Sequence, residues 1–211
     1  MKEVILYHGS RHGITGEIAP VSRKNCDFSA GFYMGENEMQ TAGLVSSEKD
    51  TAVIYRLKLS ITDDLDVLYL KDEDWLYAVL AGRDRIPEFS RLKIAGYWRE
   101  KLNSCDLVIG KIADDQMNMA MRRFRENALT DTGLYACLSR VSFGNQYAAK
   151  TKKACESIEI LEANPIRASK YSGIEKYAAK KYQESRNIVR EEQQKHLRDG
   201  LFLSEIIRRE E

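Results

Sequence analysis

The sequence predicts an α+β fold in which strands and helices share one core and a helical extension follows at the C-terminus. Residues 51–60 alternate apolar and polar side chains, as a half-buried strand does. Residues 105–112 are almost continuously apolar, which is typical of a strand buried on both faces. Residues 117–128 instead carry apolar side chains at helical spacing. Both kinds of element therefore occur within one domain.

The length and composition are those of a soluble globular chain. At 211 residues it lies near the top of the usual single-domain range. Apolar residues make up 43% and charged residues 31%, which excludes a disordered chain. The net charge of +1 argues against a protein that coats nucleic acid through bulk electrostatics. No run approaches the roughly 18 apolar residues that span a bilayer, and the N-terminus does not resemble a secretory signal, so we expect a cytoplasmic protein without a membrane partner.

The four cysteines predict neither a metal site nor a disulfide framework. They are widely spaced and form no Cys-x-x-Cys pair, at positions Cys26, Cys105, Cys137 and Cys155. We expect them to be small, buried apolar residues.

The first half of the chain contains these expected elements in order: a strand at 4–6, a loop at 11–24, a loop leading into a short strand at 27–35, a helix at 38–42 and the strand at 51–60. Phe32 and Tyr33 are neighbours on one strand and must face opposite sides, so that one enters the core and the other faces a cleft. Asn37 precedes the helix and is expected to be its N-cap.

The second half begins with a strand at 65–70 and a helix that Asp72 is expected to cap. The remaining expected elements are a helix around 92–98, the strand at 105–112, the helix at 117–128, a helix from 130 or 131, a strand at 143–151, a helix at 152–155 and a strand at 158–161. Either Asp114 or Asp115 is expected to cap the helix at 117–128. The alternative is that one of them faces a cleft and contacts a ligand or target.

The dipeptide Asn164-Pro165 divides the chain into a domain at 1–165 and a charged helical extension at 166–211. The extension predicts two helices broken near Asp199-Gly200. Two interpretations stay open: a solvated helix lying on the domain, or a docking surface for a partner or a second copy.

The segment His8-Gly9-Ser10 is the first candidate site. A histidine, a bare glycine backbone and a hydroxyl can together hold a flat ligand that bears an amide. The alternative is a strand-end histidine followed by an ordinary turn.

Three such polar positions occur along the chain: His8 with Gly9-Ser10, Tyr33 after Gly31-Phe32, and Gln146 after Gly144-Asn145. Together they resemble the histidine–tyrosine–glutamate class of ADP-ribosyltransferases, the class of diphtheria toxin and the poly(ADP-ribose) polymerases. The resemblance covers roughly residues 3–162 and is carried by Tyr7-His8-Gly9-Ser10-Arg11, Phe28-Ser29-Ala30-Gly31-Phe32-Tyr33 and Asn145-Gln146-Tyr147. The chain is also similar to a bacterial branch with the patterns Asp-Phe-x-x-Gly-Phe-Tyr and Ile-Gly-x-x-Ala-Asp-Asp.

The resemblance implies a split β-sheet core of two packed, mostly antiparallel sheets, and NAD as the substrate. It implies that the backbone of Gly9 holds the nicotinamide carboxamide, that His8 and Ser10 bond ribose or amide groups, and that Tyr33 stacks on the nicotinamide ring. Gly31 belongs to the same NAD-binding set. Arg11 is a candidate for the pyrophosphate on grounds of charge.

The chain departs from the family pattern at two positions. Gln146 stands where active members usually carry a glutamate, and an amide accepts a hydrogen bond but supplies no negative charge, a loss on the order of 10²–10³ in rate. Leu44 stands where related enzymes often carry a second aromatic ring, so that Leu44 or Met39 would cover the nicotinamide by apolar contact.

The expected function is NAD-dependent mono-ADP-ribosyl transfer to a macromolecule, with release of nicotinamide and with His8, Tyr33 and Gln146 as the catalytic residues. The resemblance is compatible with the toxin component of a bacterial toxin–antitoxin pair, with an antitoxin or a second copy bound through residues 166–211. The alternatives are a non-catalytic NAD-binding or protein-interaction module on the same scaffold, and a structural protein that acts through its extension. The acceptor cannot be identified from the sequence, and no metal is expected.

Overall fold

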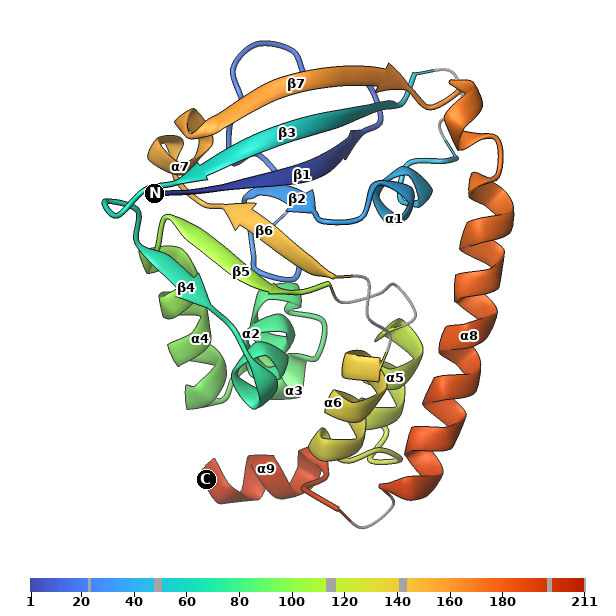
Figure 1. Ribbon diagram of the computed structural model, residues 1–211. Coiled ribbons are helices and arrows are strands. Elements are labelled where there is room, and N and C mark those ends of the chain that lie inside the picture. Colours follow the sequence, from blue (N-terminus) through green and yellow to red (C-terminus); the bar gives the residue numbers. More distant parts are fainter. Residues whose placement is uncertain (23, 48–50, 113–116, 141–143, 197–198, 211) are drawn as a thin grey trace.

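A computed structural model describes the chain except for residues 23, 48–50, 113–116, 141–143, 197–198 and 211. The alternative roles expected for Asp114 and Asp115 therefore lie outside the described residues. The expected α+β class is confirmed, because one mixed sheet is flanked by helices (Figure 1).

Seven strands among the described residues form the sheet in the order β4-β5-β6-β2-β1-β3-β7. Their bounds are β1 Lys2–Ser10, β2 Phe32–Gly35, β3 Val53–Ile61, β4 Val67–Tyr69, β5 Leu107–Lys111, β6 Asn145–Ala149 and β7 Ile158–Pro165. Among these described strands, β4 and β5 form the only parallel pair.

The strands form one hydrogen-bonded sheet and not the two packed sheets that were expected. The sheet is nevertheless split between β1 and β2, whose register consists of the single pair Tyr7↔Gly35. β1 pairs with β3 from Lys2 to Ser10, whereas β2 pairs with β6 along its four residues. Because β2 is so short and meets β1 only at one end, the two strands diverge beyond that pair (Figure 1).

Two strands extend well beyond the bounds expected from the sequence. β1 does not stop at Leu6, because pairing with β3 holds the backbone extended through Ser10. β7 continues past Leu161 to Pro165, which pairs with Val53. Proline is tolerated there because β7 is the outer strand of the sheet and needs no donor on its free side.

The helices are α1 Glu38–Gly43, α2 Asp72–Arg83, α3 Pro87–Ser90, α4 Lys93–Ser104, α5 Met117–Arg125, α6 Asp131–Arg140, α7 Lys152–Glu156, α8 Ile174–Lys195 and α9 Leu203–Glu210, with a 3₁₀ turn at Ser169–Tyr171. Asn37 caps α1 as expected, since its Oδ1 accepts from the amide of Gln40 at 2.9 Å. The expectation for Asp72 was wrong: Lys71 is the N-cap of α2, and the Asp72 carboxylate instead accepts from the Tyr135 hydroxyl at 2.7 Å.

Three apolar clusters make up the core. The first packs α2 to α6 against one face of the sheet around Trp75, Phe89 and Phe124, and the second covers the other face around Leu6 and Leu57. The third joins α1 and the start of β3 to the start of the extension. No described helix combines the length and apolar character that crossing a bilayer requires.

Cysteines occupy the core largely as expected. Cys105, Cys137 and Cys155 are buried free thiols, while Cys26 is partly exposed. Burial raises the pKa of the Cys105 and Cys155 thiols to about 11 and that of Cys137 to about 12, so these thiols stay protonated and unreactive at neutral pH.

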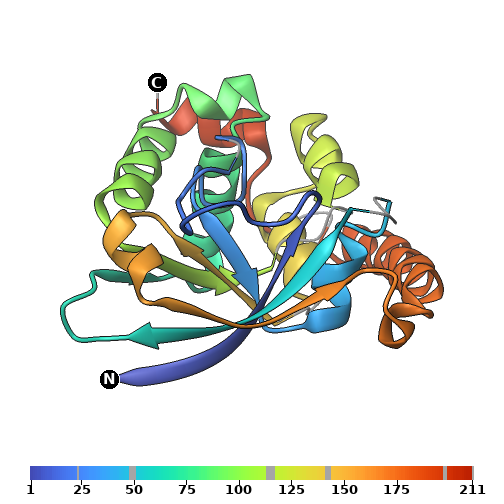
Figure 2. The ribbon, with the colours of Figure 1, turned by 90° about the horizontal axis from the view of Figure 1, so that it is seen from above.

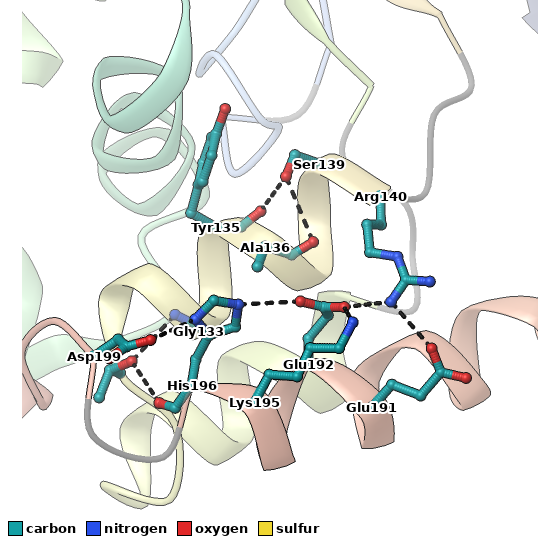
Figure 3. A network of polar contacts seen from close by, with 11 residues as sticks. Gly133, Tyr135, Ala136, Ser139, Arg140, Glu191, Glu192, Lys195, His196 and Asp199 are labelled. Atoms are coloured by element: carbon teal, nitrogen blue, oxygen red, sulfur yellow. Dashed lines mark hydrogen bonds and ion pairs between the residues drawn. The ribbon is translucent and has the colours of Figure 1, made fainter.

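The extension lies on the domain. Ile174 of α8 belongs to the third cluster, whereas Val189 of α8 and Ile206 of α9 belong to the first. In the view from above, α8 lies beside α1, and α9 lies against α3 and α4 (Figure 2). The side chain of Glu192 is buried where α8 meets α6, and its carboxylate bonds Arg140, Lys195 and His196 (Figure 3). The break between the two helices falls where Asp199-Gly200 predicted it.

Candidate functional site

A pocket of about 140 Å³ opens where β1 and β2 diverge. Four of the predicted site residues line it: His8 and Gly9 from β1, Tyr33 from β2 and Gln146 from β6. Pockets for whole drug-sized ligands have about 300–1,000 Å³, so this one accommodates a ring-sized part of a ligand. A larger groove of about 270 Å³ lies at the start of α8, but none of the predicted site residues lines it.

The imidazole of His8 is fixed and neutral. Its Nδ1 lies 2.7 Å from the backbone carbonyl oxygen of Tyr33, and because a carbonyl only accepts, Nδ1 carries the proton. Burial lowers the pKa of His8 below 6.5 although the bond to Tyr33 opposes this. The ring stacks on Phe32 with centroids 4.3 Å apart. Nε2 of the neutral ring is therefore a hydrogen-bond acceptor.

Gly9 allows α1 to approach the split closely. A Cβ at position 9 would lie 3.0 Å from the carbonyl oxygen of Thr41 and 3.2 Å from the methyl groups of Val45. Gly9 pairs with Ile54 of β3 and has no register partner in β2. Thr41 and its neighbours on α1 thereby form one wall of the pocket.

The Tyr33 side chain is held by the loop that precedes it. Its hydroxyl donates to the carbonyl oxygen of Ser29 at 2.6 Å and accepts from the amide of Phe28 at 2.8 Å. Burial, together with the nearby Asp27 carboxylate, raises the pKa of Tyr33 well above 10. Tyr33 is therefore unsuited to act as a general base, and its ring is what it can offer a ligand.

The Gln146 side chain is held from behind by a buried ion pair. Its Nε2 donates to Asp27 Oδ2 at 2.6 Å and to the backbone carbonyl oxygen of Lys111 at 3.1 Å. The other carboxylate oxygen of Asp27 bonds Nε of Arg83 at 2.6 Å. Both neighbours of Nε2 are acceptors, which fixes the orientation of the amide. Its oxygen, Oε1, has no hydrogen-bond partner among the described residues.

Three predicted site residues do not line the pocket. The hydroxyl of Ser10 donates to the carbonyl oxygen of Gly13 at 2.8 Å. Arg11 is exposed and its carbonyl oxygen accepts from the Thr51 hydroxyl. Gly31 serves packing, because a Cβ there would lie 3.1 Å from the carbonyl oxygen of Ala149.

Leu44 and Met39, the two residues expected to cover the nicotinamide ring, lie in different places. Leu44 lines the pocket and is 55% exposed, so it stands at the rim. Met39 packs in the third cluster, on the side of the extension.

Sequence reasoning missed several residues of the site. Tyr7, Gln40, Thr41 and Ile112 line the pocket, and the pair Asp27–Arg83 stands behind it. Lys150 also went unnoticed: its ammonium donates to the carbonyl oxygens of Phe28 and Ala30 and so ties down the loop before Tyr33. The sequence did offer one signal for these residues: Asp27, Arg83 and Lys150 stand in or at the end of stretches that are otherwise largely apolar, and charged side chains that are buried need partners.

Within the residues that the structure describes, no three or more His, Cys, Asp or Glu side chains gather so that they could hold a metal ion. None of the described residues that line the pocket is charged, and two of them carry a hydrogen-bond acceptor, His8 at Nε2 and Gln146 at Oε1, beside the ring of Tyr33.

Comparison with known proteins gives one match. No curated protein and no solved structure matches the chain. The family model described as "Protein of unknown function (DUF3990)" matches residues 4–160, which include His8, Tyr33 and Gln146 and end within β7. This match spans well over half of the chain, and the protein therefore belongs to the DUF3990 family.

Proposed function

We propose that this protein is an NAD-dependent mono-ADP-ribosyltransferase with an ADP-ribosyltransferase-like core. The observation that carries the proposal is the pocket at the β1–β2 split, where His8, Gly9, Tyr33 and Gln146 meet from three strands that are distant in sequence. The resemblance assigns NAD-binding roles to these four positions.

The pocket suits the nicotinamide end of NAD. Its volume of about 140 Å³ fits a ring and not a whole dinucleotide. The nicotinamide would lie against the Tyr33 ring under Leu44, with its carboxamide at the backbone of Gly9. Nε2 of His8 and Oε1 of Gln146 would accept hydrogen bonds from ribose hydroxyls. Arg11 stays a candidate for the pyrophosphate, and Ser10 would first have to release Gly13.

The proposed reaction breaks the bond between ribose C1′ and the nicotinamide nitrogen. Nicotinamide leaves with the electron pair, and a lone pair of the acceptor forms the new bond at C1′ while the acceptor loses its proton to solvent. Positive charge develops on the ribose in between. An amide at position 146 stabilises this charge less than a carboxylate would, by a factor on the order of 10²–10³. Slow transfer of single ADP-ribose groups follows.

A second candidate is a non-catalytic NAD-binding module on the same scaffold. It is favoured by the finding that no carboxylate belongs to the described residues lining the pocket, while the Asp27 carboxylate behind Gln146 is paired with Arg83. A toxin role in the cytoplasm, and an antitoxin or second copy bound to residues 166–211, are further proposals that rest on the resemblance and on the charged surface of α8.

The test is incubation of the purified protein with NAD labelled in the adenylate part, alone and with cell lysate. Nicotinamide release and transfer of label to macromolecules are measured, and protease and nuclease digestion identify the class of acceptor. We expect His8→Gln to lower release at least 10²-fold. The exposed His12 provides the matched control, and His12→Gln should behave as the wild type.

NAD binding by calorimetry without release or transfer in any lysate would favour the non-catalytic module. Absence of both binding and turnover would refute both proposals.

A further inference from the structure

The side-chain amide of Gln146 can adopt only one orientation. Both of its N–H donors are used, one by Asp27 Oδ2 at 2.6 Å and one by the Lys111 carbonyl oxygen at 3.1 Å. Turning the amide over would place Oε1 against these two acceptors, with no proton between them. Oε1 is therefore kept away from Asp27.

Asp27 is itself fixed. Its side chain is 11% exposed and that of its partner Arg83 is 6% exposed, with Oδ1 and Nε 2.6 Å apart. Arg83 stands in the last turn of α2, directly after Gly82. A Cβ at position 82 would lie 2.9 Å from the carbonyl carbon of Asp27, so α2 packs directly against the backbone of this residue. The backbone of Asp27 therefore has no room to move toward α2, and its carboxylate is held by Arg83.

This arrangement determines which residue types fit at position 146. A glutamate there would set a second carboxylate against that of Asp27 at hydrogen-bond distance in a buried place, where two like charges cannot both be ionised. An amide, in contrast, donates to Asp27 and still presents an oxygen. The Gln146 that departs from the family pattern is thus matched to the residue behind it.

We propose that Asp27 is a positioning residue of the pocket. It holds Gln146 with Oε1 available as an acceptor, and it excludes a glutamate from position 146. The effect on turnover rests on the proposed ADP-ribosyl transfer, whereas the effect on side-chain compatibility does not.

The test is a double-mutant cycle of Gln146→Glu, Asp27→Asn and the two combined, with Asp63→Asn as a control at a fully exposed aspartate. In the combined variant the amide and the carboxylate exchange places, so that the new amide at position 27 donates to the new carboxylate at position 146. We expect Gln146→Glu to lower the urea midpoint at pH 8, and the combined variant to recover part of that loss, since a glutamate at position 146 still faces the Lys111 carbonyl oxygen.

Turnover gives the readout that a merely structural role would not change. We expect the combined variant to release nicotinamide with a kcat at least 10-fold above that of the wild type and with a similar KM for NAD, because a carboxylate now stands at the pocket. Gln146→Glu alone should not reach this rate.

The proposal is overturned if Gln146→Glu is as stable as the wild type at pH 8, or if Asp27→Asn does not improve its stability. If the cycle shows the expected coupling but no variant binds or cleaves NAD, the proposed function fails while the hold of Asp27 on Gln146 stands. If the combined variant is stable and active without a gain in kcat, the compatibility argument holds and the expectation that a carboxylate at position 146 raises turnover is wrong.

Discussion

Nδ1 of His8 lies 2.7 Å from the carbonyl oxygen of Tyr33, and this bond joins β1 to β2 just beyond their single backbone register pair. The side chain of His8 thereby links β1 and β2 where their backbones no longer pair. The same bond orients the imidazole in the pocket, so one contact both supports the sheet and prepares the site.

The pKa of His8 makes this contact sensitive to acid. Burial keeps the folded-state pKa below the ordinary value of 6.5, so as pH falls below 6.5 the unfolded chain takes up a proton before the folded chain does. We expect the wild type to lose stability over this range relative to His8→Asn, whose amide donates to the same carbonyl. Urea midpoints between pH 7.5 and pH 5 measure the difference. Equal pH dependence of the two proteins would contradict the assignment, and His12→Asn is the control.

Lys150 provides a similar test of folding stability at alkaline pH. Burial lowers the pKa of its ammonium from 10.5 to about 8, so between these values the unfolded chain holds a proton that the folded chain has lost. Stability should therefore rise with pH from about 8 toward 10.5, and this rise should be absent in Lys150→Met. Denaturation at pH 7.5, 8.5 and 9.5 is the measurement. The exposed neighbour Lys152, changed to Met, should leave the rise intact.

Two helical glycines should respond to alanine with opposite signs. At Gly82 in α2 a Cβ would lie 2.9 Å from the carbonyl carbon of Asp27 and 3.0 Å from the amide nitrogen of Ser29, so Gly82→Ala should cost about 1–3 kcal/mol. At Gly96 in α4 an added Cβ would meet no atom within 4 Å apart from the neighbouring backbone of its own helix, and Gly96→Ala should stabilise by about 0.5–1 kcal/mol. Chemical denaturation of both variants checks the pair. A neutral Gly82→Ala would mean that α2 can move away from the Asp27 loop.

Glu191 and Glu192 both pair with Arg140 but differ in burial (Figure 3). The side chain of Glu191 is 56% exposed and that of Glu192 is 5% exposed. Glu191→Ala should change the free energy of unfolding by less than about 0.5 kcal/mol. Glu192→Ala should cost about 1.5–3 kcal/mol, because it removes buried charge-assisted hydrogen bonds. Similar losses for the two variants would show that α8 is not fixed to α6 by this carboxylate.

Much of the fold could be predicted from local pattern. The alternation at 51–60 and the apolar run at 105–112 gave β3 and β5, and Asn37 marked the start of α1. The extent of β1 and the identity of the α2 cap could not be predicted, because the first depends on pairing with β3 and the second on a Tyr135 hydroxyl far along the chain. The single sheet depends in the same way on how β2 meets β1.

For the candidate site, too, local patterns predicted some residues, while residues that depend on contacts between distant parts of the chain were missed. His8, Gly9, Tyr33 and Gln146 were expected because each stands in a short recognisable segment, and they do meet in one pocket. The Asp27–Arg83 pair was missed because no local pattern joins its two members: Asp27 begins the Asp-Phe-x-x-Gly-Phe-Tyr pattern, but Arg83 lies 56 residues further along the chain. Ser10 has local hydrogen-bonding alternatives that a motif does not reveal, and it uses one of them.

Helix α8 has 22 residues and is therefore about 33 Å long. Its first turn packs Ile174 among the residues behind α1, and near its last turns Val189 packs with the helices around Trp75. If one of these two regions unfolded, α8 would be displaced, and the apolar side chains that it covers in the other region would be exposed. The chain should accordingly unfold in a single cooperative transition, in spite of the weak seam in its sheet.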